Sequence, residues 1–140
     1  MMKTIRFRRS LAAMLMFGAG LSVAYADMPP VQQVGNIQYV SGGIGLDEST
    51  SMKAAEKDYS LSMVFAQHLD GQNAYAADVP ITITDSKGAI VLQTTTSGPY
   101  LLVKLPPGTY KITSTYNGKA MTRQATVSKG SHARIGFEWQ

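Results

Sequence analysis

The segment from Ser41 to Glu48 is where residue types and spacing first suggest binding chemistry. Three glycines stand close together there, in front of two adjacent carboxylates. A glycine-rich loop before a helix is a common phosphate cradle, because backbone N–H groups point at the anion. This loop lacks the lysine of a P-loop and the Gly-x-Gly-x-x-Gly spacing, and its carboxylates stand where an anion would bind. We therefore expect a tight turn.

The same segment leaves a binding role open. An acidic, glycine-lined surface suits a protein partner or a cation, although Ca²⁺ needs more oxygen ligands than this run supplies in any recognised spacing. The candidate partner-binding residues are Gly42, Gly43, Gly45, Asp47 and Glu48.

His68 and His132 are the only histidines in the chain. Two histidines without a third ligand at a recognisable spacing do not form a zinc site. No serine stands in a Gly-x-Ser-x-Gly motif, and nothing indicates a sugar cleft between Asp47 and Glu48. The sequence therefore predicts neither a catalytic set nor a metal or other cofactor.

The first 26 residues have the pattern of a secretory signal peptide. Four basic residues precede an apolar core from Leu11 to Val23, and Ala24 and Ala26 place small residues at the −3 and −1 positions. We expect cleavage between Ala26 and Asp27 and a periplasmic or secreted protein. Arg8-Arg9 leaves the twin-arginine route open, although the surrounding residues favour the general secretory route.

Removing this leader changes the charge and narrows the function classes. Four of the 13 basic residues and none of the nine acidic ones lie in it, so residues 27–140 carry nine of each. The neutral balance argues against a nucleic-acid partner. The chain has no second apolar stretch of about 20 residues, so we expect no membrane span. The absence of cysteine excludes disulfides and a lipid-modified N-terminus.

The first half of the expected mature chain combines several kinds of element. We expect a flexible lead-in over 27–36 and a strand–glycine loop–helix–strand extension over 37–76. The helix is predicted from Asp47, as its N-cap, to about Asp58, with Met52, Ala55 and Tyr59 in one apolar stripe. A strand follows from Leu61, and the polar run 68–77 is expected to be a loop.

Residues 77–140 alternate between apolar and polar types, with turn signals between the runs. Asn117-Gly118 is the strongest hairpin signal, because both central positions of a type I′ turn need positive φ. Short strands with a turn about every 8–12 residues are typical of a sandwich or barrel. This turn sets Arg123 opposite Ile112 on the apolar face, so we expect the arginine at a sheet edge or on a β-bulge, with a functional arginine as the lesser alternative.

The second half resembles the carboxypeptidase regulatory-like domain, a transthyretin-like β-sandwich. The resemblance rests on Val79-Pro80-Ile81-Thr82-Ile83, the turn from Asp85 to Gly88, and above all Leu105-Pro106-Pro107-Gly108-Thr109-Tyr110. It covers about half of the mature chain and implies an antiparallel sandwich with Tyr110 in the core. The chain departs from the family at Gly98-Pro99-Tyr100, where the glycine usually precedes the aromatic directly, and in its extension over 37–76.

These patterns predict a non-enzymatic interaction or accessory module of the bacterial cell envelope, whose partner is another envelope protein or a glycan. Contact would come through an open sheet edge or through the Gly42–Glu48 loop. A purely structural envelope protein is one alternative. Carbohydrate or peptidoglycan binding is another, with a stacking surface drawn from Tyr39, Tyr100, Tyr110 and Tyr116.

An enzyme is the remaining alternative. The stretch His68-Leu69-Asp70 weakly resembles one in hydroxyisourate hydrolases, which share the transthyretin-like sandwich. This chain lacks their C-terminal Tyr-Arg-Gly-Ser and ends in Trp139-Gln140 instead. A hydrolase of this type would require His68 and His132 to converge in one pocket.

Overall fold

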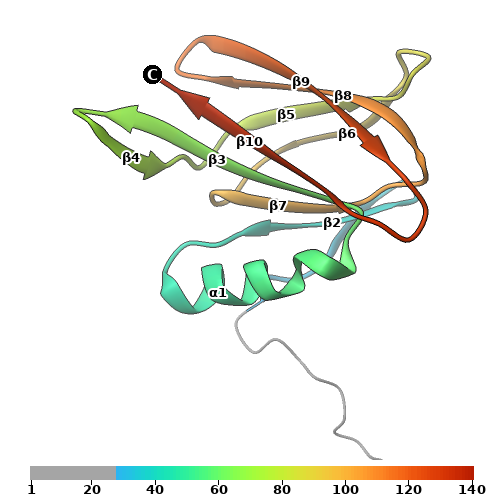
Figure 1. Cartoon of the computed structure of the whole chain (residues 1–140), viewed down its shortest axis with the longest axis horizontal. Coiled ribbons are helices and arrows are strands. Elements are labelled where there is room, and N and C mark those ends of the chain that lie inside the picture. The colour runs from blue at the N-terminus through green and yellow to red at the C-terminus, as the bar shows by residue number, and fades with distance from the viewer. Residues whose placement is uncertain (1–27) are drawn as a thin grey trace, which may run out of the picture.

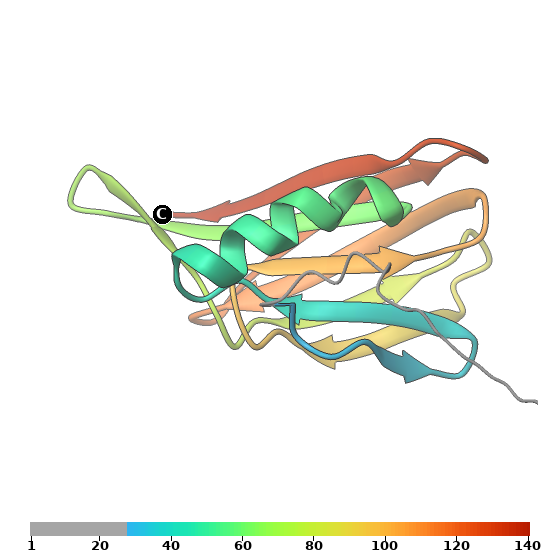
Figure 2. The same cartoon turned by 90° about the horizontal axis from the view of Figure 1, so that it is seen from below.

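The computed structural model describes residues 28–140, and the expected cleavage site at Ala26 and Asp27 lies outside them. Two β-sheets face each other, and one α-helix lies across the outer face of the larger sheet (Figures 1 and 2). The protein is therefore mainly β and sandwich-like, as the alternating strands predicted.

The larger sheet has six strands. Their order is β1 (Gln32–Val34), β2 (Ile37–Gly42), β7 (Tyr100–Lys104), β3 (Leu61–Leu69) and β10 (Ala133–Trp139), with β4 (Gln72–Tyr75) paired to the far end of β3. Every pairing in it is antiparallel except that of β3 with β10, which is parallel.

The smaller sheet has four antiparallel strands. Their order is β6 (Ile90–Thr95), β5 (Pro80–Thr84), β8 (Gly108–Tyr116) and β9 (Lys119–Val127). Asn117 (φ 51°) and Gly118 (φ 78°) form the tight β8–β9 turn that the sequence predicted.

The residues from 37 to 76 belong to the same sheet as the second half of the chain. β2 pairs with β7, and β3 lies between β7 and β10. The expected lead-in also contributes a strand, since Gln32–Val34 forms β1 against β2. The first and last parts of the described chain thus share one hydrogen-bonded sheet.

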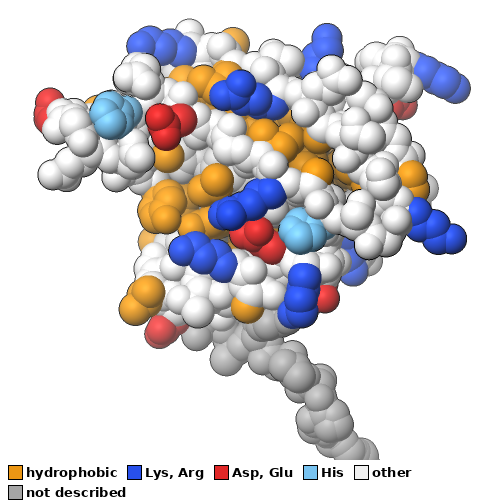
Figure 3. Space-filling view, viewed as in Figure 1, with side chains coloured by type: hydrophobic (Ala, Val, Ile, Leu, Met, Phe, Trp, Pro, Cys, Tyr) orange, Lys and Arg blue, Asp and Glu red, His pale blue; other side chains and the backbone are white. Residues whose placement is uncertain are grey.

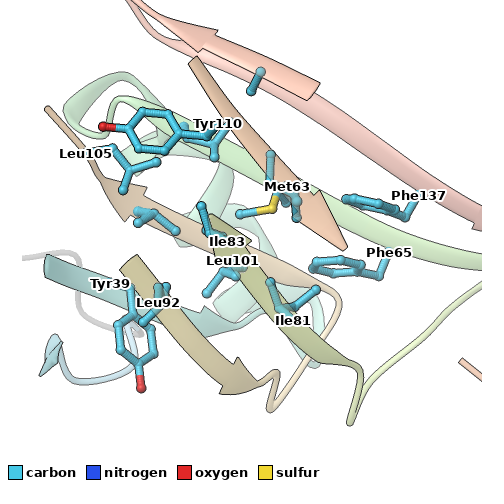
Figure 4. Packing of buried hydrophobic residues seen from close by; sticks show 14 of the residues in the cluster. Tyr39, Met63, Phe65, Ile81, Ile83, Leu92, Leu101, Leu105, Tyr110 and Phe137 are labelled. Atoms are coloured by element: carbon cyan, nitrogen blue, oxygen red, sulfur yellow. The ribbon is translucent and has the colours of Figure 1, made fainter. Parts of the chain in front are cut away.

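The main core fills the space between the two sheets (Figure 4). Alternate residues of each strand point inward, so Met63 and Phe65 from β3 meet Ile81 and Ile83 from β5. Phe65 and Phe137 stack on neighbouring strands, with ring centroids 5.4 Å apart. Tyr110 is buried here, as expected, and its hydroxyl donates to the carbonyl of Pro106 at 2.6 Å.

A second, smaller core lies between the larger sheet and the helix. α1 (Leu46–Ala55) continues into a 3-10 turn, η1 (Glu56–Asp58). The predicted stripe of Met52, Ala55 and Tyr59 is confirmed, because all three are buried against Val40, Tyr100 and Leu102.

The predicted N-cap was wrong. Gly45 is the N-cap residue, with φ 87°, and α1 begins at Leu46, so Asp47 lies within the first turn. A positive φ lets the chain reverse sharply before the helix, and glycine adopts it without steric cost. Asp47 still lies at the positive end of the helix dipole, although it makes no capping hydrogen bond.

The polar run 68–77 was predicted as a loop and is mainly a hairpin. β3 extends to Leu69, Asp70 (φ 50°) and Gly71 (φ 79°) form the turn, and β4 returns along β3. Both turn residues have the positive φ of a type I′ turn, for which Asp-Gly is a strong signal. The hairpin projects beyond the end of the sandwich (Figure 1).

Arg123 lies at an edge of the smaller sheet, which was one of the two predicted explanations. It pairs with Ile112 in an unbroken β8–β9 register, so no bulge is involved. Its guanidinium carbon lies 6.0 Å from the centre of the Phe137 ring, and its Nε donates to the carbonyl of Gly136 at 3.4 Å. Arg123 therefore bridges β9 and β10, where the two sheets meet without pairing.

Candidate functional site

The Gly42–Glu48 loop connects β2 to α1 at the end of the sandwich that also carries the β3–β4 hairpin. Its first part is buried, whereas the side chains of Ile44 and Leu46 are 65% and 80% exposed. Gly43 has φ 100°, a conformation that side chains rarely adopt. The loop thus holds two apolar side chains in solvent on a backbone that is anchored beneath them.

The Glu48 carboxylate occupies the concave side of this loop. Its Oε1 accepts hydrogen bonds from the backbone N–H of Gly43 at 2.7 Å and of Ile44 at 3.4 Å. Two successive backbone N–H groups directed at one oxygen resemble the anion-binding nests of proteins. The chain's own carboxylate fills the place that an external phosphate would need.

The structure therefore separates the two acidic residues of the predicted site. Glu48 holds the loop in shape, whereas Asp47 is exposed on the first turn of α1. Within residues 28–140, no three His, Cys, Asp or Glu side chains are grouped so that they could hold a metal ion.

The loop is packed tightly against the segment between β6 and β7. A Cβ atom on Gly43 would overlap the Tyr100 ring, and one on Gly98 would overlap the backbone of Gly42. The Ser41 hydroxyl accepts from the N–H of Ser97 at 2.8 Å, and the Ser97 hydroxyl donates back to the Ser41 carbonyl at 3.0 Å. These contacts fix the loop backbone at a place where only glycine fits.

Tyr100 connects the loop to the hairpin. Its side chain is 2% exposed, and its hydroxyl donates to that of Tyr75 at 3.2 Å, with the two ring centroids 5.7 Å apart. Burial, and then this hydrogen bond, raise the pKa of Tyr100. Tyr75 itself is 60% exposed, so it is a surface aromatic supported from below by a buried one.

Sequence reasoning missed Tyr75 because it placed the residue in a loop. The available signal was Asp70-Gly71: with a two-residue turn there, β4 returns along β3 and Tyr75 lies directly opposite Ala66.

The tyrosines that the sequence proposed as a sugar-stacking surface do not form one. Tyr39, Tyr100 and Tyr110 are buried. Tyr116 is half-buried, and its ring packs against Trp139 at 5.4 Å. These four residues belong to the cores, so a glycan would need a different surface.

The two histidines do not converge. His68 lies near the tip of the hairpin, where its Nδ1 is hydrogen-bonded to the side-chain oxygen of Asn73 at 2.8 Å. His132 is exposed just before β10, beside the start of β3, because Ala133 pairs with Leu61. Seven residues of β3 separate the two places, roughly 23 Å at the rise of a strand. The arrangement that a hydroxyisourate hydrolase would require is not formed.

A sheet edge was the other predicted contact route, and β6 is the edge that fits it. It pairs only with β5, and none of its residues from Ile90 to Thr95 is charged. Natural proteins commonly place charges or prolines on such edges to prevent pairing with other chains. By contrast, β1 is only three residues long, and β10 carries Arg134 and Glu138.

Comparison with known proteins gives only distant structural likeness. No protein-family model matches the chain, and no curated protein matches it. A crystal structure of S.CueP superposes with a TM-score of 0.39 and 16% sequence identity, covering 54% of this chain. The matched part spans 58% of the CueP chain. Within residues 28–140, no helix is long and apolar enough to span a bilayer.

Proposed function

We propose that this protein is a non-enzymatic interaction module of the bacterial cell envelope, exported by its leader and bound to another envelope protein through the Gly42–Glu48 loop. The observation that carries the proposal is the exposure of Ile44 and Leu46 on a fixed loop backbone. Apolar side chains gathered on a surface favour protein contact, because covering them removes apolar area from water.

The rigidity of the loop strengthens this proposal. Glu48, Tyr100 and Ser97 hold its backbone by hydrogen bonds and close packing. A loop already held in shape loses little conformational entropy when it binds. We assign contact to Ile44, Leu46 and the exposed Asp47, and assign Glu48 the role of shaping the loop.

The scaffold that we propose is a carboxypeptidase regulatory-like sandwich. Two features support it: the two facing sheets, and Tyr110 buried behind the Pro106-Pro107-Gly108 turn with its hydroxyl bonded to Pro106. The parallel β3–β10 pair and the helix-covered face are additions to the antiparallel sandwich that the resemblance implied.

Site-specific photo-crosslinking in cells tests this proposal. A photoreactive amino acid placed at Leu46 should form an adduct with one defined envelope protein, whereas one placed at Ile90 should not. Ile90 is the matched position because it is also apolar and exposed (59%). It lies on the β6 edge, the other predicted contact route, at the opposite end of the sandwich, so the two positions distinguish the loop from the edge.

A double variant, Ile44→Ser with Leu46→Ser, provides the second arm. It should keep the wild-type melting temperature, because both side chains are largely exposed, and should lose binding to the partner identified at position 46. Adducts at both positions, at neither, or binding that the double variant retains would contradict the proposal.

A further inference from the structure

On the outer face of the larger sheet, α1 and η1 cover β2, β7 and the first half of β3, where Ser62 is buried and Val64 packs on the second core. The uncovered part lies over the far end of β3, β4 and β10. Leu61, Met63 and Phe65 point into the main core, so the alternate residues of β3 point outward. In Figure 3, hydrophobic side chains are exposed between the β3–β4 hairpin and α1, with both acidic and basic side chains beside them.

The strand registers place complementary residues side by side on this face. Ala66 pairs with Tyr75 on one side and with Glu138 on the other. In the next row, Val64 pairs with Tyr100 and with Gly136. Tyr75 and Glu138 therefore flank a floor formed by Ala66, with Gly136 beside it in the next row. Two strand spacings, roughly 10 Å, separate Tyr75 from Glu138.

This surface is hollowed next to the exposed aromatic. A cavity of about 270 Å³ lies beside Tyr75 and is lined by Ala66, Asn73 and Ala74. The cavity lies at the hairpin side of the surface formed by Ala66, Tyr75, Gly136 and Glu138, and the last two residues do not line it. We call this surface, with its cavity, the Tyr75 groove.

Gly136 is an independent sign that something approaches this floor. A Cβ atom there would lie 3.8 Å from the nearest neighbour, an ordinary contact, and the residue does not have positive φ. Neither packing nor backbone conformation thus explains the glycine, although glycine weakens the interior of a strand. Glycine at such a position often marks close approach by a ligand or another backbone.

The polar groups around the groove are planar and include donors and acceptors. Glu138 supplies carboxylate oxygens. Arg134, two outward positions before Glu138 on β10, supplies guanidinium donors and lies 3.5 Å from the Glu56 carboxylate. The hydrogen-bonded pair of His68 and Asn73 lies at the hairpin end. Such groups bond the hydroxyls of a ligand in fixed directions.

The charges of this surface balance. Lys53, which lies 5.9 Å from the Tyr100 ring centre, and Arg134 are offset by Glu56 and Glu138. A polyanion would meet two carboxylates, and a purely apolar ligand would strip water from four charged groups. An uncharged, hydroxyl-rich ligand avoids both costs.

We propose that the Tyr75 groove binds a neutral glycan, with the apolar face of one pyranose ring packed on Tyr75 and the hydroxyls of the neighbouring rings bonded to Glu138 and Arg134. Tyr75 is suited to this role because its contact with Tyr100 fixes the ring before the ligand arrives. The groove is distinct from the Ile44 and Leu46 surface, so the protein would join a protein partner and a glycan.

Titration followed by ¹H–¹⁵N NMR tests this proposal, using protein that begins at Asp27. The probes are the tetrasaccharides of N-acetylglucosamine, β-1,4-glucose and α-1,4-glucose, with a heparin oligosaccharide as the polyanion. At least one neutral probe should shift the amides of Ala66, Tyr75 and Gly136, with a Kd of about 1 mM or tighter. Heparin should not shift them.

Three variants locate the site. Tyr75→Ala should weaken binding about tenfold. Tyr75→Phe keeps the ring and loses only the hydrogen bond from Tyr100, so it should weaken binding less than Tyr75→Ala does. Gly136→Leu should fill the floor and abolish binding, with its fold checked by the dispersion of the amide spectrum.

The Ile44→Ser and Leu46→Ser double variant leaves the Tyr75 groove intact and should bind the glycan as the wild type does. The test of glycan binding is therefore independent of the test of the protein partner. No shift with any neutral probe at about 10 mM, ten times the expected Kd, would overturn the inference. Shifts elsewhere on the protein, tighter binding of heparin, or binding unaffected by Tyr75→Ala would also overturn it.

Discussion

At the residue scale, the two adjacent carboxylates at the start of α1 have different roles. Both stand in the predicted binding segment, yet only Glu48 turns back onto the loop, where it accepts the N–H of the buried Gly43. Without the Glu48 carboxylate, the Gly43 N–H would have no hydrogen bond in a place that water reaches poorly.

We expect Glu48→Ala to lower the free energy of unfolding by about 1–2 kcal/mol. Asp47→Ala is the matched control and should cost less, because this exposed side chain contributes only its interaction with the helix dipole. Urea unfolding of the two variants checks this. Equal losses would show that Glu48 does not hold the loop.

Buried tyrosines make stability depend on alkaline pH. Burial is the largest cause that raises the pKa of Tyr59, Tyr100 and Tyr110. The hydrogen bond to Tyr75 raises the pKa of Tyr100 further. The negative charges of Asp58 and Asp85 do the same for Tyr59 and Tyr110, respectively. The unfolded chain releases these protons near pH 10, before the folded chain does. The stability contributed by the neutral phenols is therefore complete below about pH 10 and is lost as the pH rises through the folded-state pKa values.

Unfolding by urea across this pH range, with phenolate absorbance as a parallel probe, measures the effect. Tyr100→Phe removes one titrating group, so its stability should fall less steeply above about pH 10 than that of the wild type. An unchanged slope would contradict the role assigned to Tyr100.

At the element scale, glycines decide how closely the β2–α1 loop approaches the β6–β7 segment. Gly98 has no room for a side chain, since its Cβ would overlap the Gly42 backbone, whereas Gly136 on β10 has room. We expect Gly98→Ala to destabilise the protein by about 1–3 kcal/mol through overpacking.

Gly136→Ala is the control for this comparison. It should leave stability unchanged or raise it by up to about 1 kcal/mol, because alanine restricts the unfolded chain more than glycine does. Thermal unfolding of both variants distinguishes the positions. A larger loss of stability in Gly136→Ala than in Gly98→Ala would contradict this prediction. It would also show that packing requires a glycine at position 136.

At the scale of the whole molecule, the larger sheet ties the beginning of the described chain to its end. β3 pairs along its length with β10, whose Phe137 and Trp139 enter the main core. The helix packs on the other face of the same sheet. The two cores therefore share one set of strands and should unfold together.

Trp139 is the only tryptophan, so its fluorescence reports on β10 and the main core. We expect the urea midpoint of its fluorescence change to equal the midpoint of the loss of circular dichroism. The midpoint for solvent exposure of Tyr59 in the second core should be the same. A separate, earlier transition at Tyr59 would show that α1 and its neighbours form an independent unit.

Local pattern was sufficient for the elements that local chemistry controls. Strand alternation, the apolar stripe of α1 and the Asn117-Gly118 turn were all visible in the chain, because each depends on residues a few positions apart. The core position of Tyr110, which the family resemblance implied, was also correct. The export leader stays a prediction, since it lies outside residues 28–140.

Only the tertiary structure decided which residues distant in the chain lie side by side. Whether a tyrosine is buried depends on which strand and helix cover it, so Tyr100 and Tyr75 could not be distinguished by residue type. The parallel pairing of β3 with β10, which brings Ala66 beside Glu138, joins residues more than 70 positions apart, and no local periodicity encodes that register. Sequence alone therefore determined a β-rich, cysteine-free chain with a glycine loop before its helix, and long-range strand pairing decided which of its side chains a partner can reach.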